Sequence, residues 1–278
     1  GGKREPGETE AEALIRELQE ELGITPEVGE PIINVPQLYP DKRLRLDVRR
    51  VLSWKGTPRG HEGQALAWVA PEKLPRYAMP PADRPVVAAL LHPDRYLVTP
   101  SPAEVTDDAW LAALRRSLAS GQVRRIQLRM PGVEEGRRRR LAQAAVDACR
   151  AADVDVLINA DIRLARELGI GVHLRAAQLP ELSIRPLPDD QHVAASCHNA
   201  EELRRAEDLG CDFAALGSVH ETASHPGGNQ LGWEGFARLR EIVSLPLYAI
   251  GGLHADHIGE ARQHGAQGIA AIRGLWGG

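Results

Sequence analysis

The chain has 278 residues, 43% of them apolar, and a formal net charge of -4. This length favours two domains, and the small charge gives no reason to expect a nucleic-acid polymer as partner. No apolar run approaches the roughly 20 residues of a membrane span and no leader-like segment opens the chain, so we expect a cytoplasmic protein without a membrane partner.

The first predicted element is an amphipathic helix from Pro6 to Leu22, with Gly23 as its natural stop. Glu17, Glu20 and Glu21 are spaced so that their carboxylates project from one side. Like charges held this close are costly, and a divalent cation such as Mg2+ offsets the repulsion while it also binds substrate phosphates. The alternative is an exposed helix stabilised by ion pairs four residues apart.

A basic segment follows the acidic helix. Residues 43–54 begin with strict alternation of apolar and charged residues, which predicts a half-buried strand; residues 65–71 predict another strand and residues 83–91 a closing helix. Residues 1–30 carry nine acids against three bases, whereas residues 42–59 carry seven bases against one acid. Such faces suit a cation-bridged polyphosphate, although two ordinary solvated faces would have the same composition.

After a junction at residues 92–95, short β-rich runs alternate with helical runs. The predicted strands are residues 95–99, 124–130, 155–159, 171–174, 192–196, 213–219, 246–252 and 268–274. The predicted helices include residues 107–120, 136–152, 200–210, 233–243 and 255–265. Eight strand-helix units predict a (β/α)8 barrel, with a doubly wound open sheet as the competing fold.

Two other features of this half have a structural interpretation. The four arginines at residues 137–140 point in different directions on a helix, which favours a solvated helix start over a phosphate patch. Cys149, Cys197 and Cys211 are odd in number and lack metal-type spacing, so we expect reduced and mostly buried thiols.

The acidic helix and its flanks resemble the Nudix box. Its fixed positions are occupied by Gly2, Glu8, Arg16-Glu17-Leu18, Glu20-Glu21 and Gly23-Ile24. The resemblance implies an α/β/α sandwich and a hydrolase of nucleoside diphosphates linked to a further group. It also implies that the loop-helix-loop binds Mg2+ or Mn2+.

The resemblance also assigns roles within the box. The implied metal ligands are the carbonyl of Gly1 and the carboxylates of Glu17, Glu20 and Glu21. Glu17 is further expected to orient or deprotonate the attacking water, while Arg16 and Glu8 hold the helix geometry.

Three later stretches, YPDKRLRLDV, GTPRGHEGQALAWV and PPADRPVV, resemble the MutT type, which cleaves 8-oxo-dGTP to the monophosphate. The resemblance places Glu62 of the second stretch at the metals, in the catalytic set, and Lys42 of the first in substrate binding. Asp83 stands where the third stretch of that type has an asparagine that reads the base. Because an aspartate lacks the amide donor unless it is protonated, purine discrimination is in doubt and hydrolysis is not.

The Nudix fold has strands before its box, whereas this chain begins at the box. We therefore expect residues 1–92 to form a Nudix domain without its N-terminal strands, and residues 95–278 to form the barrel domain. The shortened sheet would have an exposed edge.

The barrel region resembles the thiamine phosphate synthase superfamily in IQLRM, LIN, GVHL, ASCHN, ALGSVHETASHPG and AIGG. That synthase joins a pyrimidine diphosphate to a thiazole phosphate with Mg2+, but Ala160 and Gln178 replace its metal-binding acids and His225 replaces a lysine. These losses favour the TenI-like thiazole tautomerase branch, which needs no metal and uses a histidine of an SxH stretch, here matched by Ser196 and His198.

In that interpretation His198 moves a proton on a thiazole carboxylate phosphate, a task that suits a group titrating near neutrality. Barrels often capture phosphate with glycine-rich loops after the seventh strand, where the main chain approaches the anion closely. The residues expected to hold the phosphate are Gly217, Gly251 and Gly252. Other histidines, at positions 173, 220 and 225, are expected behind the site or on the surface.

The leading hypothesis is therefore hydrolysis of an oxidised purine nucleoside triphosphate, a small-molecule substrate, to monophosphate and pyrophosphate. A second hypothesis makes thiamine chemistry the main task, with the Nudix half clearing damaged thiamine diphosphates. A third makes the barrel a sensor or scaffold that binds a thiazole or thiamine phosphate without converting it. The sequence leaves the oligomeric state open.

Overall fold

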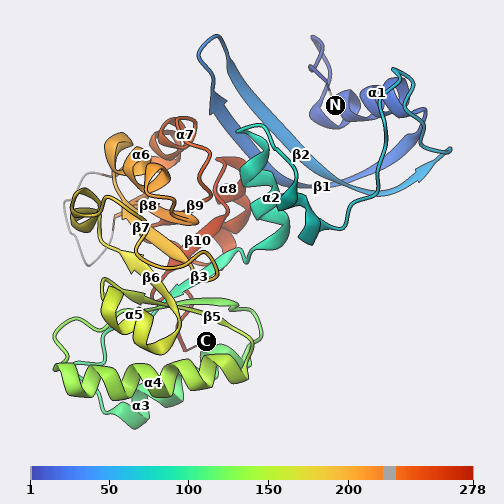
Figure 1. Cartoon of the computed structure of the whole chain (residues 1–278). Coiled ribbons are helices and arrows are strands. Elements are labelled where there is room, and N and C mark those ends of the chain that lie inside the picture. Colours follow the sequence, from blue (N-terminus) through green and yellow to red (C-terminus); the bar gives the residue numbers. More distant parts are fainter. Residues whose placement is uncertain (1, 222–229, 278) are drawn as a thin grey trace.

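The computed structural model describes residues 2–221 and 230–277, and it shows a long two-stranded ribbon beside a barrel (Figure 1). Gly1, an expected metal ligand, lies outside the described residues. Within the described ranges, no helix combines the length and the apolar character that crossing a membrane requires.

Helix α1 (Glu10–Leu22) begins later than the predicted start at Pro6 because Thr9 caps it. The Thr9 hydroxyl accepts a hydrogen bond from the Glu12 N-H, and the Glu12 carboxylate accepts one from the Thr9 N-H at 2.8 Å. This reciprocal capping box fixes the first turn. Gly23 ends the helix in the left-handed region at φ 67°, which glycine adopts readily.

The ribbon consists of β1 (Thr25–Leu38) and β2 (Arg43–Lys55), which pair antiparallel. The strand predicted at residues 43–54 is therefore confirmed. Strand β1 was not predicted, because it contains Pro26, Pro31 and Pro36. Prolines are tolerated here because β1 pairs on one side only within the described sheet. With α1 beside it, the ribbon is the mixed α/β part expected of a Nudix-like fold.

The strand predicted at residues 65–71 is wrong. Residues 65–70 have no regular structure, and η1 (Pro71–Arg76), a 3-10 helix, follows. The described sheet ends at two strands, so this segment has no neighbour to satisfy its backbone groups, and it remains exposed. The predicted closing helix is confirmed as α2 (Asp83–Leu91).

The second half is a closed barrel of eight parallel strands, which excludes the open sheet. Its strands are β3 (Arg95–Val98), β4 (Arg125–Leu128), β5 (Asp155–Asn159), β6 (Gly171–Leu174), β7 (Val193–Cys197), β8 (Phe213–Gly217), β9 (Leu247–Ile250) and β10 (Gly268–Ala271). Its helices are α3 (Asp107–Ala119), α4 (Glu135–Ala151), α5 (Ile162–Leu168), η2 (Ala176–Glu181), α6 (Ala200–Asp208), α7 (Gly232–Arg240), η3 (Ala255–His257) and α8 (Ile258–Gln263). The three cysteines are free and buried, as expected.

The arginines at residues 137–140 lie in the first turns of α4, as the helix-start interpretation predicts. Arg137 donates to Asp107 at 2.7 Å, Arg138 pairs with Asp161 at 3.3 Å, and Arg139 pairs with Glu167. These pairs tie α4 to its neighbours.

A polar cluster lies where strands β4, β5, β7 and β8 begin. The Arg125 guanidinium, whose side chain is 2% exposed, donates to Asp155 at 2.9 Å, and His192 lies between Asp155 and Asp212. Hydrogen bonds to Asp155 and Asp212 raise the pKa of His192. Burial alone would raise the pKa of Asp155, yet hydrogen bonds from His192 and the charge and hydrogen bonds of Arg125 hold it below its usual value. The cluster closes the amino-terminal end of the barrel with paired charges.

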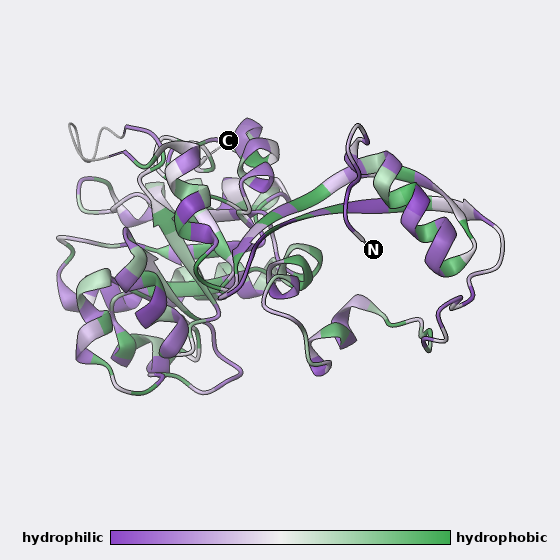
Figure 2. Cartoon of the chain, turned by 90° about the horizontal axis from the view of Figure 1, so that it is seen from above, coloured by the Kyte–Doolittle hydropathy of each residue, from purple (hydrophilic) through white to green (hydrophobic). Residues whose placement is uncertain are grey.

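The ribbon meets the barrel at the end of α7. The Arg43 guanidinium donates twice to the Glu241 carboxylate, at 2.7 and 2.5 Å, and the Leu38 N-H donates to the Glu241 carbonyl at 2.7 Å. Figure 2 shows the ribbon reaching away from the barrel, with α1 near its far end. The hairpin turn is thus held at the barrel, while the acidic helix stands apart from it.

Candidate functional site

The acidic helix is organised by the Arg16 guanidinium. It donates to Glu8 at 2.7 Å, to Glu17 at 2.9 Å and to Glu20 at 3.2 Å, and it also reaches the Lys3 carbonyl at 3.0 Å. The hydrogen bond from Arg16 lowers the pKa of Glu8, and those to Glu8 and Glu17 raise the pKa of Arg16. Arg16 therefore ties the segment before α1 to the helix and fixes the direction of the Glu17 carboxylate.

Gly2 lies directly against Glu17. A Cβ built on Gly2 would come within 2.0 Å of both Glu17 carboxylate oxygens, so a larger residue here would displace the Glu17 carboxylate from this position. The backbone at the start of the chain and the Glu17 carboxylate are thereby held at one place. This is where the sequence predicts a metal ligated by Glu17 and the Gly1 carbonyl.

The loop that carries Glu62 folds back onto the carboxyl end of α1. The His61 N-H donates to the Glu21 carbonyl at 2.9 Å, and the Arg59 N-H donates to the Leu22 carbonyl at 3.0 Å. The structure therefore brings the loop that carries Glu62 beside α1, although Glu62 lies 41 positions after Glu21 in the sequence.

The donor chemistry of this region fits Mg2+, because every expected side-chain ligand is a carboxylate. Among the described residues no three acidic or histidine side chains converge as a ligand cluster, since Arg16 engages both Glu17 and Glu20. The assignment of Glu17, Glu20, Glu21 and Glu62 as metal ligands stays a prediction that the Gly2 contact and the Glu62 loop support.

Two predicted substrate contacts are not brought to α1. Lys42 lies in the turn after β1, at the opposite end of that strand from α1, with its ammonium 5.5 Å from the Tyr39 ring centroid. Asp83 begins α2, and burial raises the pKa of its carboxyl group. That direction favours the protonated form that could donate a hydrogen bond.

In the barrel, a chain of hydrogen bonds crosses the interior and ends at Ser196. Asn159 donates to Gln127 at 3.3 Å, Gln127 donates to the Tyr96 hydroxyl at 3.3 Å, and His173 lies 3.0 Å from that hydroxyl and 2.9 Å from Ser196. Burial lowers the pKa of His173 to about 3, so its ring is neutral.

The tautomer of His173 sets the direction of the last two bonds. With the proton on Nε2, His173 accepts from Tyr96 at Nδ1 and donates to the Ser196 oxygen; with the proton on Nδ1, both directions reverse. Tyr96 and Gln127 were not among the predicted site residues, and His173 was expected only behind the site or on the surface; polar residues inside otherwise apolar strands were the available signal.

His198 lies just after β7, two residues beyond Ser196, with its side chain 60% exposed. Its Nδ1 lies 2.9 Å from the Glu202 carboxylate, which orients the ring and leaves Nε2 available. Gly217 and Gly251 are buried and Gly252 is exposed; a Cβ on Gly251, at φ 116°, would come within 2.1 Å of the Ser218 hydroxyl. Packing between the ends of β8 and β9 therefore already requires glycine at Gly251.

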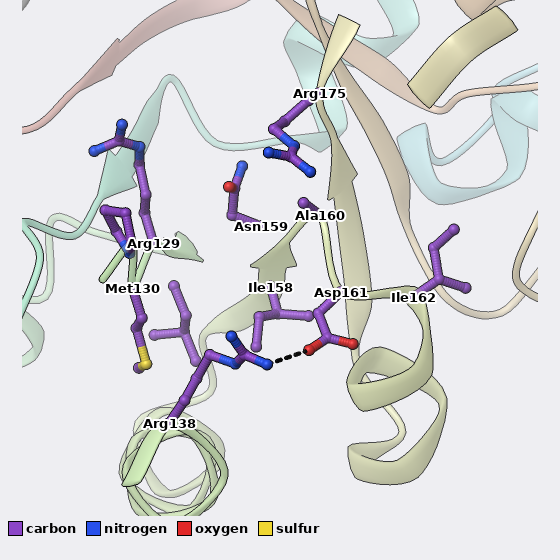
Figure 3. A pocket seen from close by; sticks show the side chains of 11 residues that line it. Arg129, Met130, Arg138, Ile158, Asn159, Ala160, Asp161, Ile162 and Arg175 are labelled. Atoms are coloured by element: carbon purple, nitrogen blue, oxygen red, sulfur yellow. Dashed lines mark ion pairs between the residues drawn. The ribbon is translucent and has the colours of Figure 1, made fainter. Parts of the chain in front are cut away.

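A cavity of about 430 Å3 opens where β4, β5 and β6 end. Figure 3 shows the arginines that line it, Arg129, Arg138 and Arg175, around Asn159 and Ala160. None of the three arginines was expected to contribute to a site.

Comparison with known proteins matches both halves. Residues 95–275 match the family described as thiamine monophosphate synthase, and residues 1–89 match the NUDIX domain. The thiamine-phosphate synthase of Methylobacillus flagellatus is 32% identical over 184 residues, covering 65% of this chain and 86% of the relative.

Two solved structures are also similar. The thiamine phosphate pyrophosphorylase from Pyrococcus furiosus has 24% identity and a TM-score of 0.52, covers 64% of this chain and 85% of its own, and shows the barrel fold. A structure from work on MutT of Aliivibrio salmonicida and Vibrio cholerae has 40% identity over 31% of this chain and 70% of its own, with a TM-score of 0.27.

Proposed function

This chain belongs to the thiamine monophosphate synthase family through residues 95–275 and carries a NUDIX domain at residues 1–89, and from this premise we propose a two-domain enzyme whose NUDIX half hydrolyses an oxidised purine nucleoside triphosphate such as 8-oxo-dGTP. The proposed domains are residues 1–92 and 95–278. Small molecules are its substrates, and we place it in the cytoplasm, where nucleotides are found.

The observation that carries this proposal is the Arg16 network. The Arg16 guanidinium bonds to Glu8, Glu17 and Glu20, which have the spacing of the Nudix box. The backbone at Gly2 lies close to the Glu17 carboxylate. Ion pairs four residues apart account for Arg16 with Glu20, but not for the bonds from Arg16 to Glu8 and to the Lys3 carbonyl, which tie the preceding segment to the helix.

In the proposed reaction, Glu17 orients a water and takes its proton. The water oxygen bonds to a phosphorus of the bridge between the α- and β-phosphates while the bridging bond breaks, so nucleoside monophosphate and pyrophosphate leave. Glu17 itself, with Glu20, Glu21, Glu62 and the Gly1 carbonyl, would hold Mg2+ or Mn2+, which when bound neutralises phosphate charge. Arg16 acts as a positioning residue, because its donors fix Glu17.

The test is pyrophosphate release by the full chain from 8-oxo-dGTP with Mg2+. Glu17→Gln should lower turnover by about 10³-fold, because the general base is lost. Glu30→Gln, an exposed acid on β1, is the matched control and should leave turnover unchanged. Unchanged turnover in Glu17→Gln, or no release by the parent chain, would reject the proposal.

Base recognition has a separate test. We propose that Asp83 contacts the purine, where a protonated carboxyl group or an amide can donate. Asp83→Asn should raise the preference for 8-oxo-dGTP over dGTP in kcat/KM by about tenfold, the effect of one well-placed hydrogen bond. If the kcat/KM ratio of 8-oxo-dGTP to dGTP did not change, Asp83 would not be a base-recognition residue, and the proposal of hydrolysis would stand.

A second candidate function concerns the barrel. His198 is exposed at the end of β7 with its ring oriented by Glu202, and the Ser196 hydroxyl, 2.9 Å from His173 Nε2, lies two residues before it. We propose proton transfer by His198 on a thiazole carboxylate phosphate, with the phosphate near Gly217, Gly251 and Gly252. His198→Ala should abolish tautomer interconversion; saturable calorimetric binding of the thiazole phosphate without turnover in the parent would instead indicate a binding module.

A further inference from the structure

The cavity at the ends of β4, β5 and β6 has a strongly positive lining. In Figure 3 the Arg175 guanidinium points toward Asn159 and Ala160, Arg129 rises from the opposite wall, and Arg138 reaches up from α4. Three separate elements therefore direct arginines at one hollow.

The only acid in the lining is already engaged. Asp161 pairs with Arg138 at 3.3 Å and accepts the Leu164 N-H at 3.0 Å as the N-cap of α5. Within residues 2–221 and 230–277, no side chain bonds or pairs with the guanidinium of Arg129 or Arg175. Arg129 and Arg175 are exposed at the mouth of the cavity, so an anion that entered it would meet two guanidinium groups without a partner among the described side chains.

Hydrogen bonds from the barrel interior hold Asn159 and Ala160, which line the cavity. Asn159 donates to Gln127 and so keeps its amide oxygen and one N-H for a ligand. Ala160 is in the left-handed region at φ 63°, which alanine rarely adopts; its N-H donates to the His173 carbonyl at 2.8 Å and its carbonyl accepts from Gln178 at 3.0 Å. These bonds fix the backbone of Ala160 in the lining of the cavity.

The family implies Mg2+ at this place, but the residues present do not fit it. Ala160 and Gln178 supply no carboxylate, and Asp161 is engaged by an arginine. A divalent cation would meet three guanidinium groups, whereas Mg2+ is normally bound through carboxylates and substrate phosphates.

We propose that this cavity binds the phosphate or diphosphate group of a small molecule without a divalent cation, with Arg175 and Arg129 supplying the charge that a metal would otherwise supply. A guanidinium offers parallel N-H donors that match two phosphate oxygens. A volume of about 430 Å3 leaves room for the organic part of such a ligand. The proposal is independent of NUDIX hydrolysis, because it uses other residues and no metal.

The test is calorimetric titration of the full chain with inorganic pyrophosphate in EDTA, and again with inorganic phosphate. We expect saturable binding of at least one of them in EDTA. Arg175→Ala and Arg129→Ala should each weaken it by about tenfold or more, the worth of a charge-assisted hydrogen bond. Arg204→Ala, an exposed arginine on α6, is the matched control and should bind as the parent does.

Arg175→Lys should lose less affinity than Arg175→Ala, because the charge remains while the paired donors are lost. Melting curves verify that each variant folds; should Arg175→Ala fail to fold, Arg129→Ala and Arg175→Lys decide the outcome. Absence of binding in EDTA, binding that appears only with Mg2+, or parental affinity in the folded arginine variants would overturn the proposal. None of these results bears on pyrophosphate release from 8-oxo-dGTP.

Discussion

The acidic helix and the arginine-lined barrel mouth carry opposite charges, and phosphate groups are proposed as the ligands of both. Carboxylates such as Glu17 and Glu20 repel a phosphate unless a cation lies between them, whereas guanidinium groups such as Arg129 and Arg175 attract it directly. In the two proposals, the sign of the nearby side chains therefore decides whether a metal is required.

The largest difference between the two regions should appear when divalent metal is removed. EDTA should lower 8-oxo-dGTP hydrolysis by on the order of 10³-fold or more, since the α1 carboxylates then repel the triphosphate. Pyrophosphate binding at the barrel mouth should persist under the same conditions. Turnover and calorimetric binding are measured in parallel on one preparation. If EDTA abolished both hydrolysis and pyrophosphate binding, the two regions would not differ in their need for a metal.

The regions also differ in how their polar groups are held. His173 is 1% exposed and bonds to both Tyr96 and Ser196, so His173→Phe removes one hydrogen bond from each, although Tyr96 keeps the bond from Gln127. We expect the free energy of unfolding to fall by about 2 to 4 kcal/mol, measured by urea denaturation. His198→Phe, at an exposed position, is the control; equal losses in both variants would contradict the assigned chain.

The pH dependence of stability should come from the amino-terminal end of the barrel. The lowered pKa values of Asp155 and Asp212 stabilise the fold above their unfolded values of about 4, and this stabilisation is lost as the pH falls. The raised pKa of His192 stabilises the fold below about 6.5, and this is lost as the pH rises through the folded value.

Urea midpoints measured between pH 3 and pH 9 check this expectation. The His192→Gln variant should lose the decline on the alkaline side and show a smaller acid limb, because Arg125 still lowers the pKa of Asp155 after the His192 hydrogen bond is lost. A variant profile identical to that of the parent would show that His192 does not contribute.

The smallest effect is expected where the two regions meet. Arg43 donates twice to Glu241, but its side chain is 65% exposed. Because exposed ion pairs are screened by water, Arg43→Ala should lower the melting temperature by about 2 °C or less. Calorimetric scans measure this, and a large drop would show that the ribbon and the barrel unfold as one unit.

Local pattern was sufficient for much of the fold. The capping and stop residues of α1 lie next to it in sequence, and the barrel strands are short apolar runs of the kind that parallel, two-face-buried strands require. The failures were also local: prolines concealed β1, and an apolar run at residues 65–71 suggested a strand for which the fold provides no partner.

The candidate sites divide in the same way. The sequence by itself determined the acidic set of α1, because helix geometry brings residues three and four apart to one side, and its eight strand-helix units favoured a barrel over an open sheet. Only the tertiary structure decided that the barrel is closed, that Lys42 lies away from α1, and that Arg129, Arg138 and Arg175 surround one cavity. These residues lie at strand ends and in loops that are far apart in the sequence, so a local sequence pattern does not predict that they are close in space.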